Sequence, residues 1–195
     1  MRAPLPPAEL ADLGLSPERM RHLVSVFQAD VDRGRLPGAV LVLARHGRIA
    51  LMEGIGRIDP AREAPMGRDA IFRIYSMTKP IVSVAVMMLI EQGRLKLADP
   101  VHVHLPEFAN QQVAVQAPTG VTLRPVQRPA TVQDLLRHTA GLTYEFLGDS
   151  SVQQMYRRDN MGSRGRTNAE FSQVLAALPL MFEPGSVWAY SRATD

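Results

Sequence analysis

The stretch Ser76–Gln92, SMTKPIVSVAVMMLIEQ, decides the fold, because it predicts a helix whose apolar residues run all round its axis. Pro80 falls in the first turn, where its missing N–H would have no partner within the helix. Gly93 follows in the position that commonly ends a helix. We therefore expect a central buried helix with Ser76 at its N-terminus.

Before this helix, the sequence predicts one amphipathic helix and two strands. An N-cap serine, a proline and an acid open the helix at Ser16, and it should end near Gly34. Apolar runs at 39–44 and 49–56 flank a turn that contains glycine, which predicts a β-hairpin. Residues 71–74 also resemble a short strand.

After it, residues 97–129 are rich in proline and read as irregular, with one short apolar stretch. Capping patterns predict two short helices, at 131–137 and at 167–178. A turn is expected at 183–185. Residues 193–195 look like the start of another helix.

The composition suits one well-filled globular domain, since 46% of the 195 residues are hydrophobic and 21% are charged. The net charge is only +3, the basic residues are dispersed and 6% of residues are aromatic, so we expect no nucleic-acid partner. Absence of cysteine excludes disulfides, thiolate zinc sites and a cysteine nucleophile.

No membrane partner is expected either. Met1–Leu10 has no apolar segment typical of a secretory signal. The longest apolar run, Ile81–Ile90, is interrupted only by Ser83 and is too short to span a bilayer. These features favour a cytoplasmic protein.

Ser76 and Lys79 form an SxxK tetrad at the head of the predicted helix. Residues three apart share a helix face, so the amine can lie beside the hydroxyl. A serine hydroxyl needs a base to become a good nucleophile, and a lysine serves as one only when its surroundings favour the neutral amine. The helix N-terminus would also direct free N–H groups at an oxyanion formed beside the serine.

The tetrad alone is a moderate signal, because 10 serines and 2 lysines predict about 0.1 such tetrads by chance. Of the 22 basic residues, 20 are arginines, which cannot act as a base, yet one of the two lysines stands here. The alternative is purely structural: Ser76 caps a buried helix and Lys79 extends to solvent.

Tyr190 is the third candidate, in the sequence Tyr190-Ser191-Arg192. A phenol beside an ammonium ionises more easily than a free phenol and so can relay a proton. Taken alone, a tyrosine at such a position is more often a core or turn residue.

Four segments together carry a family resemblance: FRIYSMTK, IEQGRLKLADPV, LLRHTAGL and FEPGSVWAYS, which begin at residues 72, 90, 135 and 182. The order and spacing of these segments resemble those of the serine beta-lactamase and penicillin-binding-protein superfamily. Within it, the chain resembles the class C-related branch that includes the family VIII carboxylesterase-like esterases. The resemblance covers 16–195. It implies an α/β (α+β) fold of the beta-lactamase/transpeptidase type, with an antiparallel sheet flanked by helices.

The resemblance also implies roles for single residues. Ser76 would be the acylated nucleophile, Lys79 its proton partner and Tyr190 the tyrosine that exchanges protons with Ser76 and the leaving group. His138 and Gly141 match a family motif that reads better as structural. No metal or organic cofactor is implied.

Two departures from the family pattern matter. Arg192 stands where class C beta-lactamases have asparagine, which favours esters over beta-lactams. No third motif of the KTG or HxG type follows Tyr190, so we expect 1–195 to be the N-terminal portion of one beta-lactamase-like domain. Its sheet start and nucleophile helix would lie at about 16–58 and 71–93, with a helical and loop region at about 97–195.

The leading hypothesis is a serine hydrolase of small carboxylic esters whose active site is incomplete in this chain. One alternative is the same chemistry on an amide, as in a beta-lactamase or a D-alanyl-D-alanine carboxypeptidase. The other is a non-catalytic truncated fragment or binding module, whose exposed sheet edge could associate with another chain.

Overall fold

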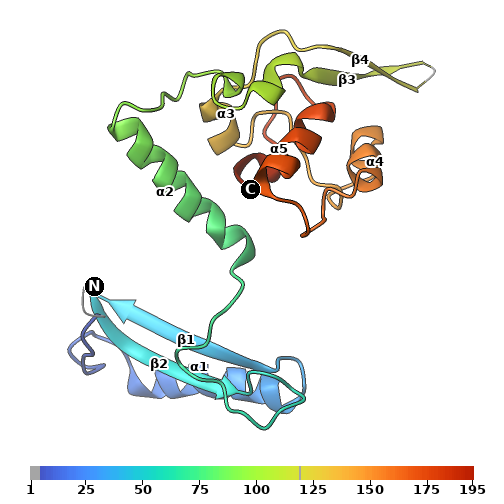
Figure 1. Ribbon diagram of the computed structural model, residues 1–195. Helices are drawn as coiled ribbons and strands as arrows, with labels where there is room; N and C mark the ends of the chain where they lie inside the picture. Colours follow the sequence, from blue (N-terminus) through green and yellow to red (C-terminus); the bar gives the residue numbers. More distant parts are fainter. Residues whose placement is uncertain (1–4, 119) are drawn as a thin grey trace. The chain divides into compact units, whose positions relative to one another are not determined.

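The computed structural model, drawn in Figure 1, describes residues 5–118 and 120–195. Residues 1–4, the start of the segment read as lacking a secretory signal, lie outside this range. The chain divides into two compact units, Met1–Arg73 and Ile74–Asp195. No helix within the described part of either unit has the length and apolarity needed to cross a membrane.

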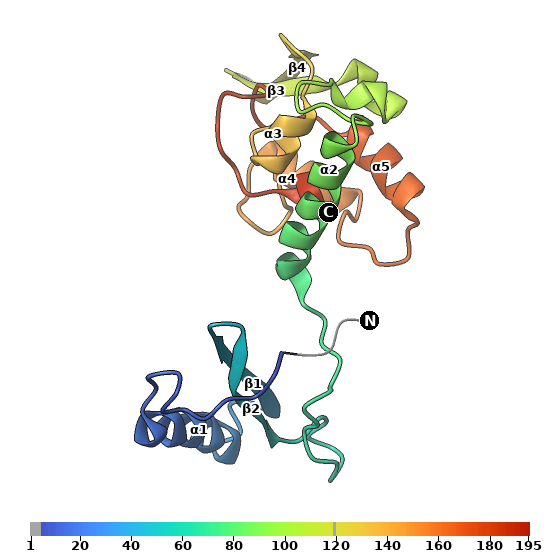
Figure 2. The same ribbon diagram turned by 90° about the vertical axis from the view of Figure 1, so that its left-hand side faces the viewer.

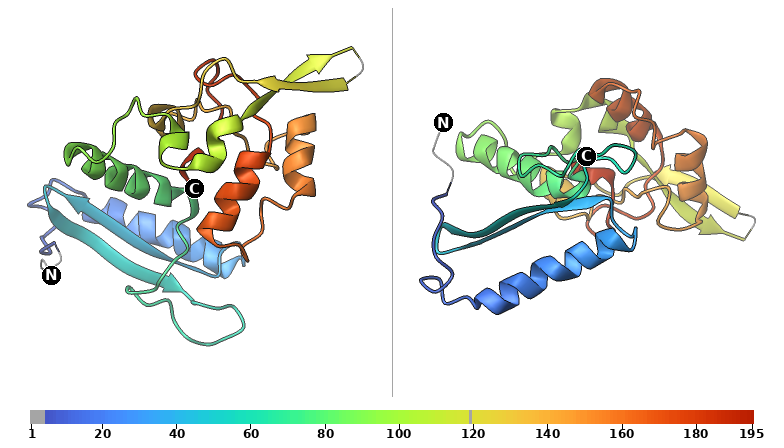
Figure 3. Two further views of the ribbon diagram at one scale, coloured as in Figure 1. Left: turned by 45° about the horizontal axis from the view of Figure 1, so that its top comes forward. Right: turned by 90° about the horizontal axis from the view of Figure 1, so that it is seen from below.

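The first unit consists of one helix and one hairpin: α1 (Pro17–Asp32), β1 (Gly38–Arg45) and β2 (Arg48–Gly56). The Ser16 hydroxyl caps α1 by accepting from the Arg19 amide at 3.3 Å, so the predicted helix is confirmed. The helix runs along one side of the hairpin (Figure 1; Figure 3, right) and contacts both strands.

The turn of this hairpin also matches the prediction. β1 and β2 are antiparallel, with Arg45 opposite Arg48. His46 and Gly47 both have positive φ, at 51° and 70°, as a two-residue turn that follows the strand twist requires. The strand predicted at residues 71–74 is wrong: no described strand pairs with it, and Ile71 is 99% exposed.

The second unit begins with α2 (Thr78–Glu91), preceded by a 3-10 turn at Tyr75–Met77. Gly93 ends it in the left-handed conformation, at φ 67°, as predicted. Its other helices and strands are β3 (Gln112–Ala117), β4 (Gly120–Pro125), α3 (Val132–Leu136), α4 (Ser151–Arg158) and α5 (Asn168–Ala177), with further 3-10 turns at Val101–Val103, Pro106–Asn110 and Arg192–Thr194.

The prediction that α2 is buried is wrong for this unit. Lys79 is the buried residue of the helix, whereas Ile81, Val84 and Met88 are each more than half exposed. Within the unit, α2 is contacted chiefly near its first turns, by the turn at Arg192–Thr194 (Figure 2). Most of its remaining apolar side chains are exposed.

The region predicted to be irregular, 97–129, contains the antiparallel hairpin β3–β4. β3 gains a further partner from a distant segment: the Ala114 amide donates to the Leu180 carbonyl at 2.9 Å, and the Leu180 amide donates to the Gln112 carbonyl at 2.8 Å. Val113 and Leu180 are both buried in the core of the unit. Burial of this one face therefore stabilises a strand with little alternating pattern.

Capping boxes begin the three short helices α3, α4 and α5. Those of α3 and α5 were predicted from the sequence, while α4, which Ser150 caps, was not. The predicted turn near 183–185 is present, at residues 184–186. The predicted architecture is confirmed: the described elements are antiparallel strands and helices.

Candidate active site

Ser76 lies in the 3-10 turn that leads into α2, and its side chain is exposed. Tyr75 before it has φ 46°, a left-handed conformation that costs a residue with a side chain free energy and is concentrated at functional sites. The N-cap residue of α2 is Met77, and no side chain makes a capping hydrogen bond there. The alternative in which Ser76 serves as the cap of α2 therefore fails.

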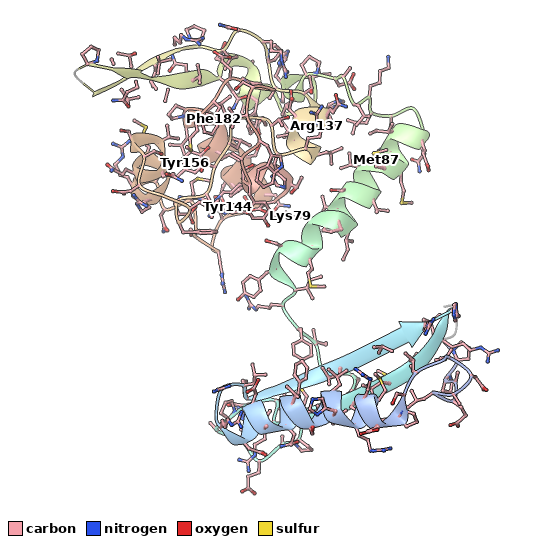
Figure 4. All side chains as sticks on the ribbon, turned by 180° about the vertical axis from the view of Figure 1, so that it is seen from behind. Lys79, Met87, Arg137, Tyr144, Tyr156 and Phe182 are labelled. Carbon is pink, nitrogen blue, oxygen red and sulfur yellow. The ribbon has the colours of Figure 1, made fainter. Side chains whose placement is uncertain are left out.

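Lys79, one helical turn after Ser76, is 7% exposed. Its ammonium donates to the Tyr144 hydroxyl at 2.8 Å and forms an ion pair with Asp195. Figure 4 labels Lys79 and Tyr144, whose side chains meet between α2 and the rest of the unit. Lys79 therefore does not extend to solvent.

Tyr190 is brought to the same place by the chain that follows the turn at residues 184–186. The Lys79 ammonium lies 5.5 Å from the centre of its ring, and the Tyr144 ring lies 5.6 Å away, centre to centre. Lys79 and Tyr190 thus lie together, and Ser76 stands three residues before Lys79. No side-chain hydrogen bond among the described residues joins Ser76 to either of them.

Arg192, the departure from the class C pattern, is engaged on all sides. Its guanidinium donates to both carboxylate oxygens of Glu145, at 2.6 and 2.7 Å, and lies 3.5 Å from an Asp195 oxygen. It also lies 4.8 Å from the centre of the Tyr144 ring. Two cations and two anions therefore face one another, so their formal charges cancel at a partly buried place.

The surroundings fix the protonation state of two neighbouring groups. Burial raises the pKa of Tyr144, and the hydrogen bond to Asp195 raises it further, so this phenol remains neutral. Burial lowers the pKa of His138 below its ordinary 6.5, and the positive charge of Lys79 lowers it further. His138 is thus a neutral imidazole at neutral pH.

His138 and Gly141 have structural contacts, in line with their reading from the sequence. The centre of the His138 ring lies 4.9 Å from that of Tyr190, with the rings tilted by 46°, and its Nδ1 accepts from the Ser191 amide at 3.3 Å. Gly141 has φ 84°, and a Cβ there would collide with the Phe182 carbonyl oxygen. Both residues hold the Tyr190 segment in place.

The pKa of His138 predicts how stability depends on pH. The unfolded chain binds a proton more readily at this site than the folded chain, so the free energy of unfolding falls as pH drops below about 6.5. Asparagine tolerates the left-handed backbone at this position. The melting temperature of His138→Asn should therefore fall less than that of the parent when the pH is lowered from about 7.5 to about 5. An equal loss in both proteins would contradict this assignment.

Reasoning from the sequence missed Tyr144, Glu145 and Asp195. Tyr144 follows the LLRHTAGL segment by two residues, and this was the one available signal. Asp195 and Glu145 are recognised as site residues only from their ion pairs, Asp195 with Lys79 and Glu145 with Arg192. The two partners of each pair are distant in sequence. As to metals, the described residues contain no cluster of three or more histidines and carboxylates that could bind an ion.

The chain is similar to known proteins of one family. Residues 23–195 match the Beta-lactamase family. Esterase EstB of Burkholderia gladioli is 38% identical over 176 residues, which are 89% of this chain and 42% of EstB. The solved structure of EstCE1, described as a hydrolase with promiscuous acyltransferase activity, is 32% identical with a TM-score of 0.74, over 89% of this chain and 44% of EstCE1.

A third relative extends the range of chemistry. Unliganded simvastatin synthase (LovD) from Aspergillus terreus is 25% identical with a TM-score of 0.70, over 89% of this chain and 45% of that protein. The chain thus spans less than half the length of these three relatives. It belongs to the Beta-lactamase family, and its relatives include esterases and acyltransferases.

Proposed function

We propose that this chain carries the acylation machinery of a serine hydrolase that acts on small carboxylic esters. The observation that supports this most directly is the buried ammonium of Lys79, held between Tyr144, Tyr190 and Asp195 one helical turn after Ser76. A buried charge is costly unless it is paired, so a paired ammonium one helical turn after Ser76 is a candidate functional group.

In the proposed reaction, the Ser76 Oγ attacks the ester carbonyl carbon, and the carbonyl electron pair moves to the oxygen. Free N–H groups at the start of α2 can donate to this oxyanion. Collapse of the intermediate breaks the bond to the alkoxide and leaves Ser76 acylated. Lys79 accepts the proton of Ser76 as a neutral amine, after one of its own protons has passed to Asp195, and Tyr190 relays a proton to the alkoxide. Water then hydrolyses the acyl-enzyme.

Arg192 supports esters rather than beta-lactams as the substrate class. In the family pattern an asparagine at this place belongs to the class C beta-lactamases, and here the guanidinium is bound by Glu145 and faces Asp195. A side chain engaged in this way has few donors left for a substrate amide. EstB is named an esterase and EstCE1 is described as a hydrolase, which agrees with esters as the substrate class.

The test compares two chromogenic substrates on the 195-residue chain. We expect kcat/KM for p-nitrophenyl butyrate to exceed that for a chromogenic cephalosporin by about tenfold or more, with Ser76→Ala as the blank for both. A cephalosporin rate that rivals the ester rate would favour the beta-lactamase alternative. Absence of any turnover above the blank would contradict acylation by this chain and favour the alternative of a truncated, non-catalytic fragment.

We also propose two further properties that the sequence indicates. One is a cytoplasmic location. The other is association with another chain through an exposed sheet edge. Size measurement of the purified chain tests the second: a monomer at micromolar concentration would contradict it.

A further inference from the structure

The ammonium of Lys79 is held by two groups that the family motifs do not include. It donates to the hydroxyl of Tyr144 at 2.8 Å and pairs with the carboxylate of Asp195. The same hydroxyl donates in turn to Asp195, whose two oxygens lie 2.9 and 2.8 Å away. Lysine, phenol and carboxylate thus form a closed triangle of contacts.

The triangle leaves one hydrogen of the Lys79 ammonium without a partner in it. An ammonium has three N–H donors and no acceptor, and a phenol has one donor. The phenol gives its hydrogen to Asp195, so its oxygen can accept from Lys79. Two of the three ammonium hydrogens are therefore engaged, and the third is free for a group at the head of α2, where Ser76 lies.

The triangle has rigid support behind it. Asp195 faces Arg192, and Arg192 is held by three contacts to Glu145 between 2.6 and 3.2 Å. Tyr144 is 6% exposed and lies under the Arg192 guanidinium. A supported, charge-balanced group holds its geometry better than an isolated ion pair.

We propose that Tyr144 and Asp195 are positioning residues that hold the Lys79 ammonium in one orientation, with its third hydrogen directed toward the reacting serine. The consequence for catalysis rests on the proposed function. The positioning itself does not, and it has its own readout.

That readout is nuclear magnetic resonance of the lysine side-chain nitrogens, which is simple here because the chain has two lysines, Lys79 and Lys96. Lys96 is exposed, so its ammonium hydrogens exchange rapidly with water. Hydrogens held in buried hydrogen bonds exchange slowly. At neutral pH we expect one protected ammonium signal, which persists in Lys96→Arg.

Tyr144→Phe removes one acceptor and Asp195→Asn removes the negative charge of the ion pair, so each should speed the exchange of this signal about tenfold or more. Tyr156→Phe is the matched control, because Tyr156 is fully buried and its hydroxyl makes no hydrogen bond of ordinary geometry with the described residues. It should leave the signal unchanged. An unchanged signal in Tyr144→Phe, or no protected signal in the parent, would overturn the proposal whatever the activity.

The same variants give a kinetic readout. Misplacing a reacting group by about 1 Å can cost up to about 10²-fold in rate, so Tyr144→Phe should lower kcat for p-nitrophenyl butyrate by up to that factor and alter its pH profile, with KM little changed. Tyr156→Phe should match the parent. A parent with the protected signal but no turnover would disprove the proposed function and leave the positioning intact.

Discussion

Replacing Ser76 with alanine is expected to lower p-nitrophenyl butyrate hydrolysis by about 10³-fold or more. Removal of the nucleophile from a serine hydrolase costs up to about 10⁶ in kcat, because no other group forms the acyl-enzyme. Stability should change by no more than about 0.5 kcal/mol, because the side chain is exposed and makes no hydrogen bond with the described residues. Initial rates and thermal melts measure the two effects.

The matched control is Ser83→Ala, in α2 and seven residues after Ser76. Ser83 is partly buried and lies outside the SxxK tetrad, so its replacement should leave the rate within about twofold of the parent. Equal rates in Ser76→Ala and the parent would show that the observed turnover does not use Ser76. A loss of about 1 kcal/mol in stability without a loss of rate would restore a capping role.

Asp134→Ala is expected to cost about 2–4 kcal/mol in the free energy of unfolding. The carboxylate is 4% exposed and accepts five hydrogen bonds, from the Arg128 guanidinium, the Thr131 amide and hydroxyl, and the Thr139 hydroxyl. Alanine would leave those buried donors without partners. Arg128 is half-exposed and can be rehydrated, which keeps the cost below that of a fully buried pair.

Acid provides an independent test of the same carboxylate. Burial alone would raise the pKa of Asp134, but the bonds from Arg128, Thr131 and Thr139 lower it from 3.8 to about 2. A lowered pKa contributes stability above the unfolded value, and that stability is lost as pH falls from about 4 to about 2. The contribution is about 2 kcal/mol. Urea denaturation of Asp134→Asn should show a correspondingly smaller acid loss; an equal loss would refute the assignment.

Elements with local signals were predicted well. Ser16 caps α1, Thr131 and Thr167 form the capping boxes that were expected, and the turn at His46 and Gly47 closes the hairpin as its sequence indicates. These features depend on hydrogen bonds within a few residues. The helix α4 carried a comparable signal, a serine at 150 followed by glutamine at 153, that was not used.

Elements that depend on distant partners were not predicted. β3 is stabilised by Leu180, which is remote in sequence, and by burial of Val113 in the core. The burial expected of α2 followed from its own apolar residues, but burial requires surfaces that lie against the helix. In its own unit the buried residue of the helix is Lys79, in its first turn.

The candidate site divides in the same way. Ser76, Lys79 and Tyr190 were chosen from motif spacing, and the structure brings the last two together. The contacts of Lys79 with Tyr144 and Asp195 could not be predicted, because nothing near these two residues in the sequence indicates a lysine partner. Tertiary contacts alone reveal that the ammonium is paired and balanced.

The central claim is that Ser76 becomes covalently acylated, and trapping it tests this most directly. The chain would be treated with a fluorophosphonate, digested and sequenced by mass spectrometry. Trypsin does not cleave before Pro80, so the expected peptide spans residues 74–94 and holds both Ser76 and Ser83, which fragmentation must separate. The account predicts one adduct per chain, on Ser76, and none after heat denaturation. An adduct on another serine, or none on the folded chain, would contradict it.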